Sequence, residues 1–245
     1  MISLMFAAGQ GRRLFGGDDS QPPKCLLRFG GETLLQRHIR ILKKFGLSEL
    51  VMVVGYRAHD IRAHVLDIGA KNFVRFIDNP RFKQGSVLSL SKASEVLRSG
   101  NPILCMDADV LYDPLIIDRI LAIGNRTVFP YDSEFDQGDE PVKLCLNRSK
   151  PVEFRKEPDD IPYEVVGEWV GFMRLEPDFA KALAEQSIRD SATVMDMPYE
   201  DSVRAVLRNG WARKTTAIDI NGLAWIEIDF PEDVELARTD ILEKV

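Results

Sequence analysis

The first half of the chain alternates short apolar runs with stretches of helical periodicity, and this alternation limits the possible folds more than any other feature. The apolar runs are typical of buried strands, and they cover residues 2–6, 50–54, 73–77 and 103–106. The helical patterns that follow them cover residues 34–45, 58–66, 87–97 and 115–123. Strands that alternate with helices at this spacing predict crossover connections and a mainly parallel sheet with helices on both faces.

The pattern changes after about residue 126. Short strands are expected at 127–130, 142–146 and 152–155, a longer strand region at 164–175, and two further strands at 215–220 and 224–229. Helices are expected at 178–186, 200–207 and 232–242. No internal repeat or flexible linker interrupts the sequence. We therefore expect a single α/β domain over residues 1–245.

Composition and charge exclude several kinds of partner. The 38 acidic and 32 basic side chains give a formal net charge of −6, which predicts no nucleic-acid partner because such binding depends on neutralising phosphates. No window is apolar for long enough to span a bilayer, so no membrane partner is expected. Three widely spaced cysteines without a CxxC pair favour reduced thiols and a cytoplasmic location. An enzyme or a small-molecule binder fits these limits.

A glycine-rich loop, Ala-Ala-Gly-Gln-Gly-Arg-Arg at residues 7–13, directly follows the first strand. Gly9 and Gly11 permit a tight turn that brings backbone N–H groups close to phosphate oxygens. The loop matches neither the dinucleotide fingerprint nor the Walker motif. It carries Arg13 instead, and Lys24 follows in a Pro-Lys pair; both cations suit phosphate oxygens. The alternative is an ordinary glycine turn with exposed basic residues. The Pro-Lys pair that follows favours the phosphate-binding loop over this alternative.

Two acidic pairs each follow an apolar strand. Asp107 and Asp109 come after the run 103–106, and Glu227 and Asp229 repeat the arrangement late in the chain. Acidic side chains at the carboxyl end of a parallel strand lie where open α/β sheets bind ligands. Together the pairs predict a Mg²⁺ site with Asp109 and Asp229 as ligands, and with Asp107 and Glu227 behind them or at the substrate. Strand-end caps or turn residues are the alternative.

These motifs resemble those of the nucleotidyltransferase superfamily that includes the nucleoside-diphosphate-sugar pyrophosphorylases. The matches are the loop 7–13, Pro23-Lys24, Asp109 and Asp229, and they span nearly the whole chain. Within the superfamily the sequence is most similar to the phosphocholine cytidylyltransferase branch. The resemblance implies a Rossmann-like three-layer α/β/α fold with a mainly parallel mixed sheet. It also implies a nucleotide-binding half at 1–125 and a half at 126–245 that binds the acceptor and supplies the second metal ligand.

The resemblance implies transfer of a nucleoside monophosphate, with CTP as the favoured donor, to a small phosphorylated or phosphonylated acceptor. Arg13 and Lys24 would be catalytic, with Arg13 and the loop amides on the β and γ phosphates and Lys24 at the reacting phosphate. The phosphate monoester is largely dianionic at neutral pH and needs no general base. The expected nucleotide-binding residues are Ala8, Gly9, Gly11, Arg13, Gln84, Gly85 and Ser86. Ser86 is equally well explained as a helix N-cap.

The acceptor site is less well marked in the sequence. Aromatic side chains favour quaternary ammonium groups, and Tyr163, Trp169, Phe172 and Tyr199 are candidates, although each is better explained as a core or loop residue. Glu200 and Asp201 open a helix, where acids are common, and are candidates for a cationic head group or a second metal.

Phosphocholine, aminoethylphosphonate, inositol phosphate and other phospho-alcohols remain open as acceptors. A sugar-1-phosphate nucleotidyltransferase that uses UTP, dTTP or GTP is the alternative function, ahead of a glycosyltransferase or an inactive nucleotide binder. His38 lies on an apolar helix face and is expected in the core, and His59 and His64 are spaced unsuitably for a helical metal pair. The oligomeric state is left open.

Overall fold

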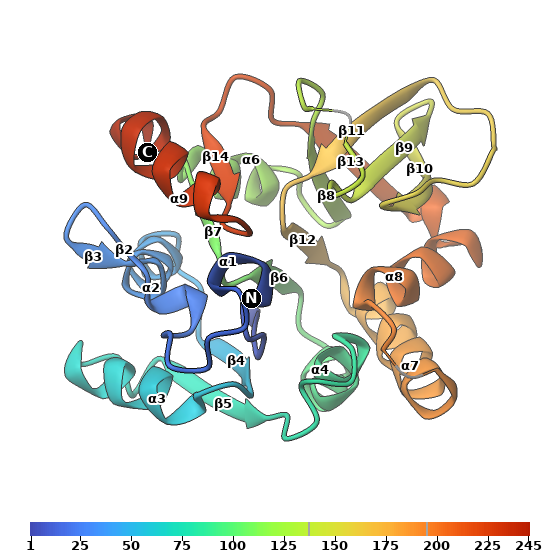
Figure 1. The fold of residues 1–245 in the computed structure, drawn as a ribbon. Coiled ribbons are helices and arrows are strands. Elements are labelled where there is room, and N and C mark those ends of the chain that lie inside the picture. Colours follow the sequence, from blue (N-terminus) through green and yellow to red (C-terminus); the bar gives the residue numbers. More distant parts are fainter. Residues whose placement is uncertain (137, 195) are drawn as a thin grey trace.

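A ten-stranded mixed sheet forms the centre of the computed structural model, which describes residues 1–136, 138–194 and 196–245 (Figure 1). Its strand order is β10-β9-β11-β8-β12-β6-β1-β4-β5, and β13 pairs with β8. The strands of this sheet are β1 (Ile2–Ala7), β4 (Leu50–Val54), β5 (Val74–Asp78), β6 (Ile103–Asp107), β8 (Thr127–Asp132), β9 (Lys143–Asn147), β10 (Lys150–Arg155), β11 (Val165–Trp169), β12 (Phe172–Leu175) and β13 (Thr215–Asp219).

The remaining elements are helices and two small two-stranded sheets. The small sheets pair β2 (Arg28–Phe29) with β3 (Glu32–Thr33), and β7 (Val110–Tyr112) with β14 (Trp225–Glu227). The α-helices are α1 (Arg12–Phe15), α2 (Leu34–Lys44), α3 (Ala58–Asp67), α4 (Val87–Lys92), α5 (Ser94–Leu97), α6 (Leu115–Ala122), α7 (Pro177–Thr193), α8 (Tyr199–Arg208) and α9 (Pro231–Leu236). Short helical turns occupy Lys24–Leu26, Trp211–Lys214, Ala237–Ile241 and Leu242–Lys244. None of the described helices combines the length and apolarity that a bilayer crossing requires.

The first half of the chain builds a parallel sheet, as the alternating pattern predicts. β6, β1, β4 and β5 are neighbours in that order, and each pair is parallel. The residues of β4 are all fully buried, which explains its continuous apolar sequence. Because the strands are parallel, their carboxyl ends meet at one edge, where the glycine loop follows β1 and Asp107 ends β6.

Helices cover both faces of the sheet and bury two apolar clusters. The cluster with α2, α3 and α6 lies on one face, and the cluster with α4, α5, α7 and α8 on the other. Both clusters draw on both halves of the chain: Phe172 and Ile220 pack into the first, and Leu4 and Val51 into the second. The α/β/α arrangement confirms the expected fold class, and the two halves of the chain share both cores.

Several predicted boundaries are wrong. The helix expected at 87–97 divides at Ala93 into α4 and α5. The strand region 164–175 divides at Gly171, where φ is +81° and a Cβ would lie 2.9 Å from Val110 Cγ2. The helix expected at 178–186 continues to Thr193, and the closing helix changes into a π-helical turn at Ala237. The short strands β2, β3 and β7 were not predicted.

Candidate active site

The glycine loop turns directly from β1 into the short helix α1. Gly11 has φ +65°, in the left-handed region, and a Cβ on it would lie 3.1 Å from Lys24 Cγ. Ala8 is buried, and its carbonyl accepts a hydrogen bond from Tyr56 N, which ties the loop to the end of β4. A small cavity of about 80 Å³ lies against the loop and is lined by Gly9, Gly11, Lys24 and Asp109. The loop therefore faces the predicted catalytic and metal-binding residues.

Lys24 lies between two carboxylates from distant parts of the chain. Its ammonium donates hydrogen bonds to Asp229 Oδ1 at 2.6 Å and to Asp109 Oδ2 at 3.0 Å, and its side chain is only 13% exposed. Burial opposes the charge of Lys24, but the attraction of Asp109 and Asp229 outweighs it and raises the pKa of the ammonium. Lys24 is therefore held charged at the sheet edge.

Arg13 reaches the same carboxylate from the other side. Its guanidinium donates to Asp229 Oδ2 at 2.7 Å and also pairs with Glu140. It lies over the ring of Phe230, 5.3 Å from the centroid. Burial would raise the pKa of Asp229, but Lys24 and Arg13 lower it, so this carboxylate is ionised at neutral pH. Glu140 was missed by the sequence analysis because nothing in its acidic surroundings distinguishes it.

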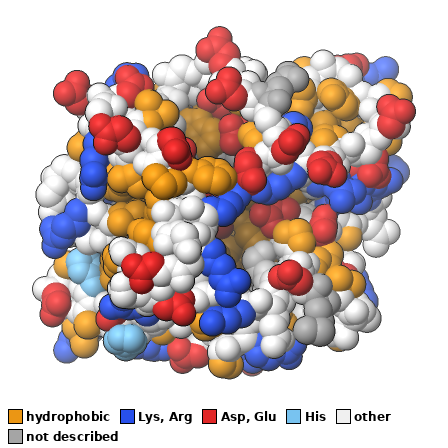
Figure 2. Space-filling model, in the orientation of Figure 1, with side chains coloured by type: hydrophobic (Ala, Val, Ile, Leu, Met, Phe, Trp, Pro, Cys, Tyr) orange, Lys and Arg blue, Asp and Glu red, His pale blue; other side chains and the backbone are white. Residues whose placement is uncertain are grey.

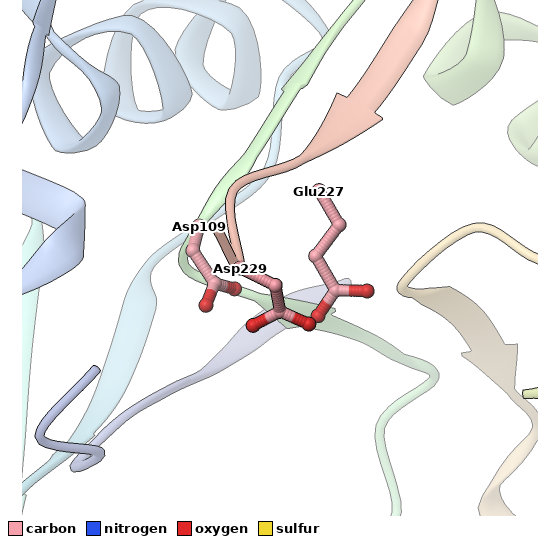
Figure 3. A group of neighbouring side chains, drawn as sticks. All are labelled: Asp109, Glu227 and Asp229. Atoms are coloured by element: carbon pink, nitrogen blue, oxygen red, sulfur yellow. The ribbon is translucent and has the colours of Figure 1, made fainter. Parts of the chain in front are cut away.

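Asp109, Glu227 and Asp229 form a convergent group, and their carboxylates point toward one another in Figure 3. Each offers one oxygen, and these oxygens lie within 4.8 Å of one another. The pairing of β14 with β7 produces this convergence, and Ile228 N also donates to Asp109 O at 3.0 Å. The two acidic pairs of the sequence thus meet in space. Glu227, expected behind the ligands, belongs to the convergent group itself.

Asp107 has a different environment from Asp109. Both of its carboxylate oxygens accept from the Tyr199 hydroxyl at 3.0 Å, and burial together with the nearby Glu227 and Asp109 raises its pKa. Glu200 lies next to this group. Burial raises its pKa to about 6, and its Oε2 is shielded from solvent without a hydrogen-bond partner among the described residues. Asp201 lines a neighbouring cavity with Glu200.

The segment Gln84–Ser86 lies against the chain before α8. Gly85 has φ +93°, and a Cβ on it would lie 2.7 Å from Met197 N, so a backbone passes where a side chain would be. Ser86 Oγ accepts from Tyr199 N at 2.9 Å and makes no capping bond to its own helix. Ser86 therefore occupies the N-cap position of α4, as expected, but its hydroxyl does not cap the helix. Contact of Gln84, Gly85 and Ser86 with a base stays a prediction.

The aromatic candidates for an acceptor cage do not gather into one. Phe172 is fully buried in the core, and Trp169 and Tyr199 are almost fully buried, whereas Tyr163 is exposed. The core explanation is thus confirmed for three of the four. His38 is also a core residue, as expected: its Nε2 lies 3.2 Å from Ala108 O, and burial lowers its pKa to about 4.

Comparison with known proteins finds related sequences over most of the chain. Residues 3–156 match the family described as the MobA-like NTP transferase domain. The chain is 28% identical over 244 residues to a bifunctional IPC transferase and DIPP synthase of Rubrobacter xylanophilus, covering 98% of this chain and 52% of that protein. It is 20% identical to a CTP:phosphoglutamine cytidylyltransferase of Campylobacter jejuni, covering 96% of this chain and 98% of that one. The chain spans about half the length of the bifunctional relatives it matches.

Solved structures share the fold. The inositol-1-phosphate CTP transferase of T. maritima superposes with a TM-score of 0.77 at 19% identity, covering 99% of this chain and 93% of that one. A CTP:phosphocholine cytidylyltransferase of Streptococcus pneumoniae gives 0.75 at 17% identity, with 96% of each chain covered. The family match includes the glycine loop, Lys24 and Asp109. The chain belongs to the MobA-like NTP transferase domain family, a family of nucleotidyltransferases.

Proposed function

We propose that this protein transfers CMP from CTP to a small phosphorylated or phosphonylated acceptor and releases pyrophosphate. The observation that carries the proposal is the placement of Lys24 between Asp109 and Asp229, beside the glycine loop at the carboxyl edge of the sheet. The choice of CTP is supported by the names of the relatives, which include a phosphoglutamine cytidylyltransferase and a phosphocholine cytidylyltransferase.

Asp109, Glu227 and Asp229 fit a Mg²⁺ ion, because each offers a carboxylate oxygen and the three oxygens converge. Such an ion, when bound, would neutralise charge on the triphosphate and orient its α-phosphate. In the structure Lys24 and Arg13 balance the charge of Asp109 and Asp229. When a triphosphate binds, both cations would turn from these carboxylates toward the phosphate oxygens, and the metal ion would take their place at the carboxylates.

The loop and its cations would hold the triphosphate. The backbone around Gly9 and Gly11 borders the small cavity, with Ala8 fixing the start of the turn. Arg13 offers a planar pair of donors that suits the β and γ phosphates. Lys24 would contact the α-phosphate and the incoming phosphate together, which brings two mutually repelling anions into reaction distance.

The reaction then requires no proton removal. An oxygen of the acceptor phosphate, dianionic above a pKa of about 6, attacks the α-phosphorus in line and forms a new P–O bond. The bond from the α-phosphorus to the bridging oxygen breaks, and its electron pair leaves with pyrophosphate. The ammonium of Lys24 would stabilise the charge that accumulates on the equatorial oxygens. A buried base is not needed, which agrees with the placement of His38 in the core.

Pyrophosphate release tests the proposal. CTP, UTP, dTTP and GTP are each supplied with Mg²⁺ and a panel of phospho-alcohols, phosphonates and sugar phosphates. Lys24→Ala and Asp229→Asn should each lower turnover by about a hundredfold or more, whereas Lys181→Ala, an exposed change on α7, should not. Highest turnover with UTP, dTTP or GTP and a sugar 1-phosphate would support the alternative, a sugar-1-phosphate nucleotidyltransferase. Near-normal release in both site variants would exclude the proposed residue roles.

A further inference from the structure

A second, larger cavity opens directly beside the convergent carboxylates, on the side of the acceptor half. Its volume is about 430 Å³, and Glu227 and Asp229 form part of its wall. The other walls come from the end of β8, from the segment between β8 and β9, and from β11, β14 and α9. An acceptor whose phosphate lies at Lys24 would therefore extend its other end into this cavity, which we call the acid–aromatic pocket.

The lining of the acid–aromatic pocket carries an unbalanced negative charge. Eight of its fourteen lining residues are Asp or Glu, and none of them is Lys or Arg. Glu140 is paired with Arg13 and Lys156, and Asp233 accepts from the backbone of residues 229 and 230. Asp132 and Glu168, in contrast, make no ion pair within the part of the chain that the structure describes. Figure 2 shows acidic side chains gathered over the upper half of the face, with a recess that has an apolar floor among them.

Asp132 and Glu168 lie directly opposite each other on the antiparallel strands β8 and β11. Like charges in this position destabilise a sheet unless something compensates them. Burial and the neighbouring Asp132 raise the pKa of Glu168 to about 7. Lys143 pairs with Glu168 in register on β9, but its ammonium donates to the carbonyls of Gly138 and Lys156. The two carboxylates thus have no ion-pair partner among the described residues, and a cation bound beside them would favour the ionised form of Glu168.

An indole ring forms another part of the wall. Trp225 Nε1 donates to Asp132 Oδ2 at 2.9 Å, which fixes the ring beside the carboxylate pair. Phe135 also lines the pocket. Aromatic faces attract ammonium groups, and tryptophan does so most strongly. A ring and two carboxylates on one wall match a cation that is partly apolar, such as a methylated or alkyl ammonium.

Two other occupants of the acid–aromatic pocket, a metal ion and a neutral polyol, fit less well. Among the described residues, one group of three side chains is close enough to hold a metal ion, and its members are Asp109, Glu227 and Asp229. Asp132 and Glu168 do not belong to this group, so they offer no comparable metal site. The neighbouring cavity of about 210 Å³ beside Glu200 and Asp201 is lined by four acidic and two basic residues, so Arg155 and Lys156 already balance part of its charge. A neutral polyol would neither compensate the charge of Asp132 nor favour the ionised form of Glu168.

We propose that the acid–aromatic pocket binds the cationic end of the acceptor, so that the acceptor is a small phosphate or phosphonate carrying an ammonium or quaternary ammonium group. Asp132 and Glu168 supply the charge and Trp225 the aromatic face. This inference rests on the proposed function and narrows its substrate class.

The test compares acceptors that differ in charge but not in shape. Phosphocholine is paired with dimethylbutyl phosphate, in which carbon replaces nitrogen, and phosphoethanolamine is paired with propyl phosphate. Inositol phosphate and glucose phosphate complete the panel. Pyrophosphate release with CTP and Mg²⁺ gives kcat/KM for each. For at least one pair, the cationic member should exceed its neutral partner by about tenfold or more.

Glu168→Gln removes one charge without changing shape and should bring that ratio close to one, mainly through the KM of the cationic acceptor. Glu185→Gln, an exposed carboxylate on α7, should leave the ratio unchanged. If Glu168→Gln does not fold, the comparison in the unmodified protein still decides. Equal or better use of the neutral members, or of the sugar and inositol phosphates, overturns this inference while leaving the proposed function intact.

Calorimetry without nucleotide measures the affinity of the protein for both members of each acceptor pair. This measurement separates charge recognition by the pocket from the proposed function. Tighter binding of the cationic member together with no pyrophosphate release would reject the proposed function and support charge recognition by the pocket. Equal binding of both members would reject charge recognition whether or not the protein turns over.

Discussion

Replacing Lys24 by methionine removes the ammonium that lies between Asp109 and Asp229 but keeps a side chain of similar length. Asp109, Glu227 and Asp229 then face one another with only Arg13 still paired to Asp229. The change should destabilise the protein in the absence of metal, because uncompensated carboxylates lie close together where solvent reaches them poorly. Asp109 and Asp229 are 21% and 17% exposed.

The size of the loss follows from this geometry. Removing one partner of a buried ion pair costs roughly 3–5 kcal/mol. Partial exposure and the remaining Arg13 place this site at the lower limit, about 3 kcal/mol. For a chain of this length, 1 kcal/mol corresponds to about 2–4 °C in Tm, so the expected decrease is roughly 6–12 °C. The pKa of Lys24 is raised in the folded protein, so its contribution is fully present below the ordinary lysine pKa and is lost only as the pH rises through the higher folded value.

Thermal unfolding at pH 7 in EDTA and in Mg²⁺ measures both effects. In EDTA, Lys24→Met should unfold well below the unmodified protein, and Lys181→Met, an exposed change on α7, should not. Mg²⁺ should raise the Tm of Lys24→Met more than that of the unmodified protein, since Lys24 no longer competes for Asp109 and Asp229. A ligand at a hundred times its Kd adds about 2.7 kcal/mol. An unchanged Tm in EDTA would refute the reasoning that Lys24 compensates these carboxylates.

Three further predictions concern single side chains. His38→Gln should remove a pH dependence of stability, because burial lowers the pKa of His38 from 6.5 to about 4 in the folded protein. Below pH 6.5 the unfolded chain binds a proton that the folded protein does not, so the unmodified protein loses up to about 3 kcal/mol of stability by pH 4. Urea unfolding of both proteins from pH 4 to pH 8 measures this, and parallel curves would contradict it. Gly85→Ala should cost about 2 kcal/mol or more in urea unfolding, because its Cβ would lie 2.7 Å from Met197 N at φ +93°; unchanged stability would mean that this backbone contact does not form. Gly11→Ala should lower turnover about tenfold or more by displacing Lys24, which lies 3.1 Å from the added Cβ, while circular dichroism stays unchanged. Full activity would show that Lys24 tolerates the shift.

The regular elements near the sheet were largely predictable, because periodicity is a local property of the sequence. The runs that became β1, β4, β5 and β6 are apolar since both faces of a parallel sheet are covered. The sequence also singled out Arg13, Lys24, Asp109 and Asp229, which the structure brings together. Their catalytic and metal-binding roles stay predictions.

What the sequence did not reveal depends on contacts between distant segments. The three-residue strand β7 is too short to have a periodicity, yet its pairing with β14 brings Glu227 into the convergent group. Glu140 lies in an acidic stretch where no residue stands out, and Glu168 lies in an apolar strand whose sequence does not show what the side chain faces. The pocket role proposed for Trp225 depends on its bond to Asp132, 93 residues away in sequence, which no local pattern encodes. Trp169, Phe172 and Tyr199, which the sequence offered as candidates for an acceptor cage, are buried in the core instead, where aromatic side chains most often lie.

Phosphorus NMR of one reaction tests the central claim most directly. The protein is incubated with CTP, Mg²⁺ and phosphocholine, and in parallel with the other acceptors of the panel. The account predicts that, with at least one acceptor, the CTP signals are replaced by equal amounts of pyrophosphate and of a diphosphate diester that joins CMP to the acceptor. The Asp229→Asn protein should give neither product at a comparable rate. CTP that stays intact with every acceptor, or that is cleaved without joining one, would contradict the account.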